Sequence, residues 1–113
     1  MRHFSKDRPQ ASHGEDGCEA LLFETLDRIR AISARVGQSM ATVSLAWLLH
    51  QPGVTAVLAG SRKPQHIIQN AQAADLELPP EVVAELSAAT GELKRALGPN
   101  QDMYLTAAES RIY

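Results

Sequence analysis

The side chains best suited to chemistry gather at one turn of the chain. Gly60 allows a ligand to approach the backbone closely. Arg62 carries a planar fork of donors that matches a phosphate better than a lysine does. Pro64 fits the first position of a helix, whose N-terminus adds partial positive charge beside the turn. The stretch therefore predicts a site for an anionic group, most simply a phosphate.

Polar residues on either side of Arg62 extend this candidate site. Ser61 can donate its hydroxyl to a ligand. Asn70 follows His66 by four positions, so the two side chains share one face of the predicted helix. On that face the Asn70 amide could contact the edge of a base, and His66 could contact another part of the ligand.

Each of these residues also has an ordinary structural interpretation. Arg62 could be a surface arginine that caps nearby carbonyl groups or pairs with Asp75 or Glu77. An exposed asparagine on a helix is common, as is a solvated histidine, so Asn70 and His66 need not contact any ligand. The residue types alone leave both interpretations open.

Other kinds of catalysis have little support in the sequence. The single Cys18 excludes an internal disulfide framework and a multi-cysteine zinc site, and its acidic neighbours disfavour a reactive thiolate. The chain has no metal-binding histidine pair, no glycine-rich phosphate loop and no serine elbow motif. We therefore expect neither a catalytic residue nor a metal site.

Composition describes one globular domain of modest size. The 113 residues are 44% hydrophobic, and 11 basic against 13 acidic residues give a net charge of −2. This balance argues against a general nucleic-acid or anionic-membrane surface. No apolar run is long enough to span a membrane, and the N-terminus lacks the apolar core of a signal peptide. With one cysteine, a reducing, cytoplasmic compartment fits best.

Two helices are predicted ahead of the candidate site. Residues 1–17 show no apolar periodicity and are expected to form a mobile arm. A helix is expected over 19–36, ended by Gly37, and a second over 40–51, capped by Ser39. The second is apolar over most of its circumference, which favours burial on more than one side. The stripe of the first helix consists of Leu22, Leu26, Ile29, Ile32 and Val36.

The elements that position the turn are a predicted strand and a predicted helix. Val54–Ala59 is a continuous apolar run rich in β-branched residues, which is typical of a parallel strand covered on both faces. Because such a strand cannot satisfy its own backbone groups, it needs neighbouring strands that the sequence does not otherwise predict. After the turn we expect a helix over 64–74, an extended link over 75–78, and a helix from Pro80 that Gly91 interrupts.

A different pattern resembles a helix-turn-helix. Residues 31–45 contain a helix, a turn glycine and a capping serine before a second helix start. A recognition helix should present polar and basic side chains to base edges. No lysine or arginine occurs between Gln38 and Gln51, so DNA binding is the weaker alternative.

Four segments together resemble the C-terminal end of the aldo/keto reductase family. The resemblance covers roughly residues 20–113, and the first seventeen residues do not match. It implies that residues 18–113 are the last helices, the eighth strand (54–59), the C-terminal helix and the tail of a (β/α)8 TIM barrel of the α/β class. The four segments are Ser44–Ala56, Ala59–Asn70, Leu97–Tyr104 and Glu109–Ile112.

The same resemblance implies an NADPH site. Gly60, Ser61 and Arg62 fall where the family holds the adenosine 2′-phosphate, and His66, Gln69 and Asn70 fall where it contacts the adenine and ribose. The chain departs from the family at three positions. His66 stands where the family usually has a glutamine, and Gln69 where it often has a glutamate. Lys63 stands where the family often has a threonine or serine, and this lysine adds positive charge beside the turn.

The family's catalytic Asp, Tyr, Lys and His come from the first half of its barrel and have no counterpart in this chain. We therefore expect an NADPH-binding segment of a truncated or split carbonyl reductase, inactive alone. Its partner would be the missing barrel half or a self-associated copy. The alternatives are a non-enzymatic helical module for interaction or oligomerisation and the helix-turn-helix DNA binder.

Overall fold

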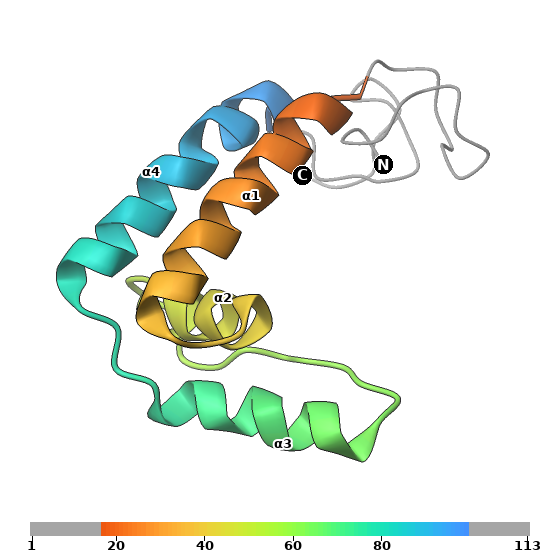
Figure 1. The fold of residues 1–113 in the computed structure, drawn as a ribbon, viewed down its shortest axis with the longest axis vertical. Helices are drawn as coiled ribbons and strands as arrows, with labels where there is room; N and C mark the ends of the chain where they lie inside the picture. The colour runs from red at the N-terminus through yellow and green to blue at the C-terminus, as the bar shows by residue number, and fades with distance from the viewer. Residues whose placement is uncertain (1–16, 100–113) are drawn as a thin grey trace. The chain divides into compact units, whose positions relative to one another are not determined.

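The computed structural model describes residues 17–99, which form helices joined by irregular connections, the longest over residues 50–63 (Figure 1). Apart from Gly17, the predicted N-terminal arm lies outside the described residues, as does the predicted tail from residue 101. The helices are α1 (Glu19–Val36), α2 (Met40–Leu49), α3 (Pro64–Gln72) and α4 (Pro80–Leu97), with a 3₁₀ turn η1 (Ala73–Asp75) after α3.

The chain divides into two compact units, and α1 and α4 each run through both. The central unit is Arg28–Ala89, which includes α2, α3 and the candidate site. The terminal unit includes residues 17–27 and 90–99 of the described part. In the terminal unit Thr25 is buried, and its hydroxyl donates to the Leu21 carbonyl at 2.8 Å, one turn back along α1.

The predicted helix over 19–36 is confirmed with the same bounds, and its end has a clear cause. Gly37 adopts a φ of 74°, a left-handed conformation that glycine reaches without steric cost. The Gln38 amide donates to the Ser33 carbonyl and the Gly37 amide to the Ala34 carbonyl, each at 3.1 Å. These two bonds form the Schellman pattern, which satisfies carbonyls that a helix end otherwise leaves unpaired.

Helix α2 begins where Ser39 predicts it. The Ser39 hydroxyl accepts a hydrogen bond from the Thr42 amide at 3.1 Å, as an N-cap side chain should. The helix ends at Leu49, two residues before the predicted end, and the chain then turns at Gly53 with a φ of 80°. Burial is concentrated on one face of α2, that of Thr42, Val43 and Ala46.

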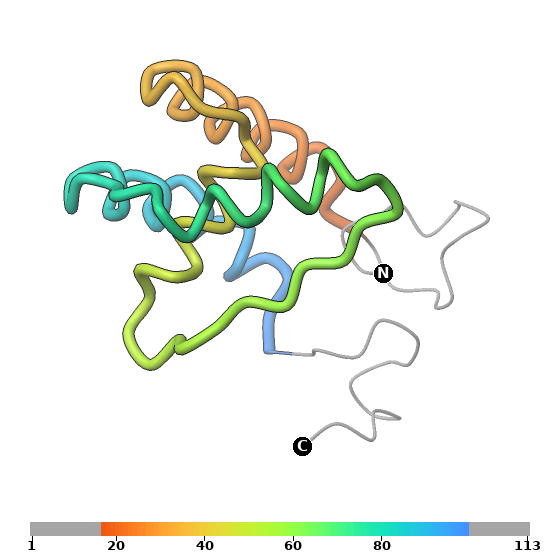
Figure 2. The backbone as a smooth tube through the Cα atoms, turned by 90° about the horizontal axis from the view of Figure 1, so that it is seen from below, coloured from red at the N-terminus to blue at the C-terminus, as the bar shows by residue number. Residues whose placement is uncertain are grey.

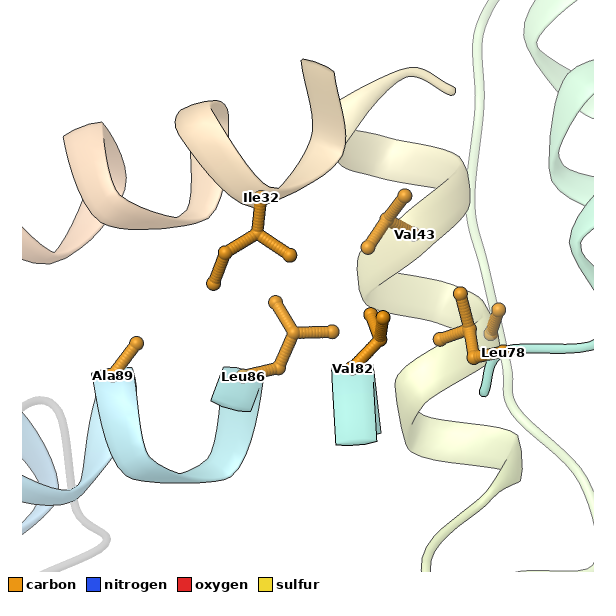
Figure 3. Close-up of a cluster of buried hydrophobic side chains, with 7 residues drawn as sticks. Ile32, Val43, Leu78, Val82, Leu86 and Ala89 are labelled. Carbon is orange, nitrogen blue, oxygen red and sulfur yellow. The ribbon is translucent and has the colours of Figure 1, made fainter. Parts of the chain in front are cut away.

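One hydrophobic core organises the central unit (Figure 3). In this core Ile32 of α1 and Leu86 of α4 point toward one another, and Val43 enters from α2. Trp47 packs at the edge, where its indole N–H donates to the Ser87 hydroxyl at 2.9 Å. The buried members are Ile32, Val43, Ala46, Leu78, Val82, Leu86 and Ala89.

The strand predicted over Val54–Ala59 is wrong, and with it the α/β barrel class predicted for this chain. No strand occurs anywhere in residues 17–99, and Val54–Ala59 has no regular secondary structure. Figure 2 traces this connection from α2 to α3. A β-strand needs a neighbour to receive its backbone hydrogen bonds. The described residues supply none, and Leu58 within this stretch is fully exposed.

The interruption predicted at Gly91 is also wrong. Helix α4 runs through Gly91 to Leu97. A glycine inside a helix costs only about 1 kcal/mol relative to alanine, which the rest of an 18-residue helix can offset. The helix ends before Gly98, which adopts a φ of 69°.

Candidate functional site

The turn that precedes α3 borders a pocket of about 510 Å³. All of its lining residues come from one short stretch of chain, where the connection from α2 enters α3. A pocket of this size can hold a phosphate together with part of the group that carries it. Its lining residues are Gly60, Ser61, Arg62, Lys63 and His66.

Ser61 fixes the shape of the turn. Its hydroxyl donates to the Lys63 carbonyl at 3.0 Å and accepts from the Lys63 amide at 3.1 Å. Local bonds of this kind are the usual way a serine stabilises a turn. Because the hydroxyl proton is directed to Lys63, Ser61 positions its neighbours here and does not itself offer a donor to a ligand.

The start of α3 presents a donor beside the same turn. Lys63 is the N-cap residue, in an extended conformation and without a side-chain cap, and Pro64 follows it. The amides of His66 and Ile67 both donate to the Lys63 carbonyl, at 3.1 and 3.4 Å. The Gln65 amide has no backbone acceptor among the described residues. A helix N-terminus with such a donor favours an anion.

The electrostatic character of the pocket is basic. Arg62, Lys63 and His66 are exposed, and within residues 17–99 none of them forms an ion pair. The pairing of Arg62 with Asp75 or Glu77 that the sequence left open is therefore absent. The Glu77 carboxylate instead lies 3.8 Å from the His50 imidazole.

The structure gathers part of the predicted residue set. Gly60, Ser61, Arg62 and His66 line the pocket, whereas Gln69 and Asn70, further along α3, do not. Lys63 also lines the pocket, although the family resemblance identified it only as a departure that adds positive charge. The sequence could have indicated that Lys63 lines the pocket, because Lys63 lies between Arg62 and the proline that begins the helix.

A second hollow, of about 410 Å³, lies between α1 and α4 in the central unit, and the sequence did not predict it. The Arg35 guanidinium donates to both carboxylate oxygens of Glu85 across it, with Nη1 and Oε1 3.2 Å apart. These hydrogen bonds hold the pKa of the Glu85 carboxyl below its ordinary value and raise the pKa of Arg35. The remaining lining residues are Arg28, Ala31, Ile32, Ala88 and Ala89.

The helix-turn-helix pattern of α1 and α2 is present in outline, but α2 is not placed to read DNA. Its central residues Thr42, Val43 and Ala46 are buried, and the sequence from Gln38 to Gln51 has no lysine or arginine. A recognition helix must expose polar or basic side chains to base edges. The geometry does not favour a DNA-binding role for α2.

Residues 17–99 hold neither a metal-binding cluster nor a membrane-spanning helix. No group of three or more histidine, cysteine or acidic side chains in this range is arranged to hold a metal ion. None of the helices in the same range combines the length and the apolar character that crossing a membrane requires.

Comparison with known proteins gives one family match. The model of the aldo/keto reductase family matches residues 2–90. The match starts earlier than the resemblance seen in the sequence, which began near residue 20, and it ends before the tail. No solved structure matches the chain significantly.

Two curated proteins are similar to part of the chain. A probable voltage-gated potassium channel subunit beta from Oryza sativa subsp. japonica is 32% identical over 74 residues, which are 61% of this chain and 23% of the rice protein. A putative voltage-gated potassium channel subunit beta from Schizosaccharomyces pombe is 32% identical over 66 residues, 54% of this chain and 19% of the yeast protein. The chain thus spans about a fifth to a quarter of these relatives.

Proposed function

Because this chain belongs to the aldo/keto reductase family, we propose that it is an NADP(H)-binding segment of an oxidoreductase of that family. In this proposal the pocket before α3 holds the adenosine 2′-phosphate, with Arg62 as its principal ligand. His66, Gln69 and Asn70 of α3 would contact the adenine and ribose.

The observation that carries this proposal is the charge of the pocket lining. Arg62, Lys63 and His66 contribute basic groups, no acidic residue lines the pocket, and the N-terminus of α3 adds its partial positive charge. A phosphate monoester carries between one and two negative charges at neutral pH. The 2′-phosphate is the group that distinguishes NADPH from NADH, so this pocket supports selectivity between the two.

Catalysis requires groups that these 113 residues do not hold. The resemblance assigns proton donation in carbonyl reduction to a tyrosine supported by Asp, Lys and His, none of which has a counterpart here. We therefore propose cofactor binding without turnover by this chain alone. Carbonyl reduction would need the regions that account for the rest of the relatives' length, supplied by another chain or by a second copy.

The test is a calorimetric titration of the chain with NADPH and, separately, with NADH. We expect tighter binding of NADPH, and an Arg62→Ala variant should weaken NADPH binding by about tenfold or more. A hydrogen bond to a charged group contributes about 1.5–3 kcal/mol. The affinity for NADH should stay the same, because NADH has no 2′-phosphate.

Arg28→Ala is the matched control, since Arg28 is another exposed arginine of the central unit and does not line this pocket. It should leave both affinities unchanged. Equal affinity of the unmodified chain for NADPH and NADH would refute the assignment of the 2′-phosphate. Oxidation of NADPH by the purified chain with an aldehyde would refute the proposed lack of turnover.

A second candidate function, a non-enzymatic helical interaction module, is favoured by one observation. Helix α3 carries Ile67 and Ile68 at 57% and 61% exposure, and no residue of this helix is buried. Large apolar side chains exposed together commonly mark a contact surface.

A further inference from the structure

The pocket before α3 contains one side chain of a type that changes its charge near neutral pH. Arginine and lysine side chains stay positive throughout this range, whereas histidine side chains gain their charge as the pH falls from about 8 to about 5. Arg62, Lys63 and His66 all line the pocket. The pocket therefore combines two constant positive charges with one that depends on pH.

Local structure places His66 beside the other two residues. It lies in the first turn of α3, where its amide donates to the Lys63 carbonyl at 3.1 Å. The lining residues fall within residues 60–66, so the arrangement does not depend on packing against a distant part of the chain. The His66 side chain is exposed, so both a proton and a ligand can reach it.

The charged groups around His66 within residues 17–99 are positive. Helix α3 packs against α2 and η1. Helix α2 contains no charged or titratable residue, and the acidic residue of η1, Asp75, lies beyond the opposite end of α3. Helix α3 itself has no charged residue besides His66. The charges that face His66 are those of Arg62, Lys63 and the N-terminus of α3, so a bound anion would supply the negative partner.

We propose that His66 makes the preference for NADP(H) over NAD(H) depend on pH. In mild acid its imidazole gains a proton and adds a third positive charge beside the 2′-phosphate, and in mild alkali it is neutral. The 2′-phosphate is attached to the adenosine ribose, which is the part of the cofactor that His66 would contact. This inference rests on the proposed function and adds to it a residue that sets cofactor specificity.

The phosphate titrates in the same range, with the opposite effect. A phosphate monoester has a second pKa of about 6, so acid reduces its charge and weakens its attraction to any constant cation. The contribution of His66 must therefore be measured against a variant in which only the phosphate titrates. His66→Gln is that variant, since glutamine keeps a neutral, hydrogen-bonding side chain at every pH.

The experiment is a calorimetric titration of the full 113-residue chain with NADP⁺ and with NAD⁺, at about pH 6 and at about pH 8. Both cofactors share any contact of His66 with the adenine, so the ratio of their affinities isolates the 2′-phosphate. At the lower pH this ratio should be about threefold higher for the unmodified chain than for His66→Gln, which is the size expected of an exposed charge pair. At the higher pH the two ratios should agree.

Two further variants sharpen this test. His66→Lys carries a constant charge, so its ratio should exceed that of His66→Gln at both pH values. His50→Gln is the matched control, because His50 is the other described histidine, follows α2 and does not line the pocket. Its ratios should match those of the unmodified chain. Circular dichroism verifies that each variant retains its helices.

Proton exchange on binding gives an independent measurement. Positive groups favour the doubly charged phosphate, so His66→Gln should release protons when it binds NADP⁺ at the lower pH. The unmodified chain should release fewer, because the bound phosphate favours the protonated imidazole. Titrations in two buffers of different ionisation enthalpy measure the number of protons released.

Two distinguishable results would overturn the inference. Equal affinity for NADP⁺ and NAD⁺ at both pH values would mean that the pocket does not hold the 2′-phosphate, so the proposed function would fail as well. A preference for NADP⁺ with the same pH dependence in the unmodified chain and in His66→Gln would leave the proposed function intact and would exclude the role of His66.

Discussion

Ile32 and Ile68 are the same residue type, and each lies on the apolar face of an amphipathic helix. Ile32 is 4% exposed and Ile68 is 61% exposed. Around Ile32, α1, α2 and α4 contribute apolar side chains from three directions (Figure 3). Around Ile68, helix α3 presents its apolar face without such partners. The central unit therefore contains a packed half, formed by α1, α2 and α4, and an open half, residues 54–72.

The difference between these halves shows that apolar periodicity identifies which face of a helix is apolar. It does not identify the surface that packs against that face. The continuous apolar run Val54–Ala59 makes the same point, because its residues are mostly exposed and form no strand. Functional groups follow the division as well. The basic pocket is in the open half, where Arg62 and Lys63 remain free of acidic partners among the described residues.

Among the predicted changes in the free energy of unfolding, the largest should come from truncating a core leucine. Leu86→Ala removes a side chain that is 3% exposed and in contact with the core, so it should destabilise the chain by about 2–5 kcal/mol. Leu58→Ala makes the same chemical change at a fully exposed position and should alter stability by less than about 0.5 kcal/mol. Urea denaturation followed by circular dichroism measures both.

Comparable losses from the two leucine variants would break the comparison. They would mean that residues 54–59 are buried in the folded chain and that the open half is packed in solution.

A smaller effect is expected at the two helix starts. Ser39 caps α2 through its hydroxyl, so Ser39→Ala should cost about 1 kcal/mol. Lys63 provides no side-chain cap to α3, so Lys63→Ser should add one there. The added cap should stabilise α3 locally, and we expect to see this as slower amide hydrogen exchange in α3. The effect should stay local, because α3 has no buried residue that would couple it strongly to global unfolding.

Hydrogen exchange measured for both variants separates local from global effects. If Lys63→Ser raised the midpoint of global unfolding by as much as Ser39→Ala lowered it, α3 would be part of the cooperative core.

The smallest effect concerns the Arg35–Glu85 pair of the packed half. The hydrogen bonds from Arg35 lower the pKa of Glu85 in the folded chain. The stabilising contribution of Glu85 is therefore complete above the ordinary carboxyl pKa and is lost as the pH falls through the lower, folded-state value. Both side chains are largely exposed, at 61% and 44%, so solvent screens the pair and the effect is slight.

Melting temperatures of the unmodified chain and of Glu85→Gln, compared from neutral to acidic pH, measure this contribution. The small advantage of the unmodified chain should be constant near neutrality and should disappear in acid. It should also shrink at high salt. An advantage that grew in acid would contradict the direction of the pKa change.

Much of the helical structure was predictable from local sequence. The stripe that includes Ile29 and Ile32 specified α1, Gly37 ended it, Ser39 began α2 and Pro64 began α3. These features depend on backbone preferences and on hydrogen bonds between residues a few positions apart, so the nearby sequence contains what determines them.

The candidate site was predictable in part, for the same reason. The turn with Gly60 and Arg62 and the helix that follows it are local features, and the structure forms a pocket from that turn. The lining role of Lys63 and the position of Gln69 outside the pocket depend on how the turn meets the helix. Residue types alone do not determine the direction in which the helix leaves the turn.

The sequence by itself determined which segments are helical and which of their faces are apolar. Only the tertiary structure decided which faces are buried, because burial needs a second surface contributed from a distant part of the chain. Ile32 receives that surface from Leu86, 54 positions later. Val54–Ala59 receives none in the described residues, and an extended segment without a neighbour for its backbone amides does not become a strand.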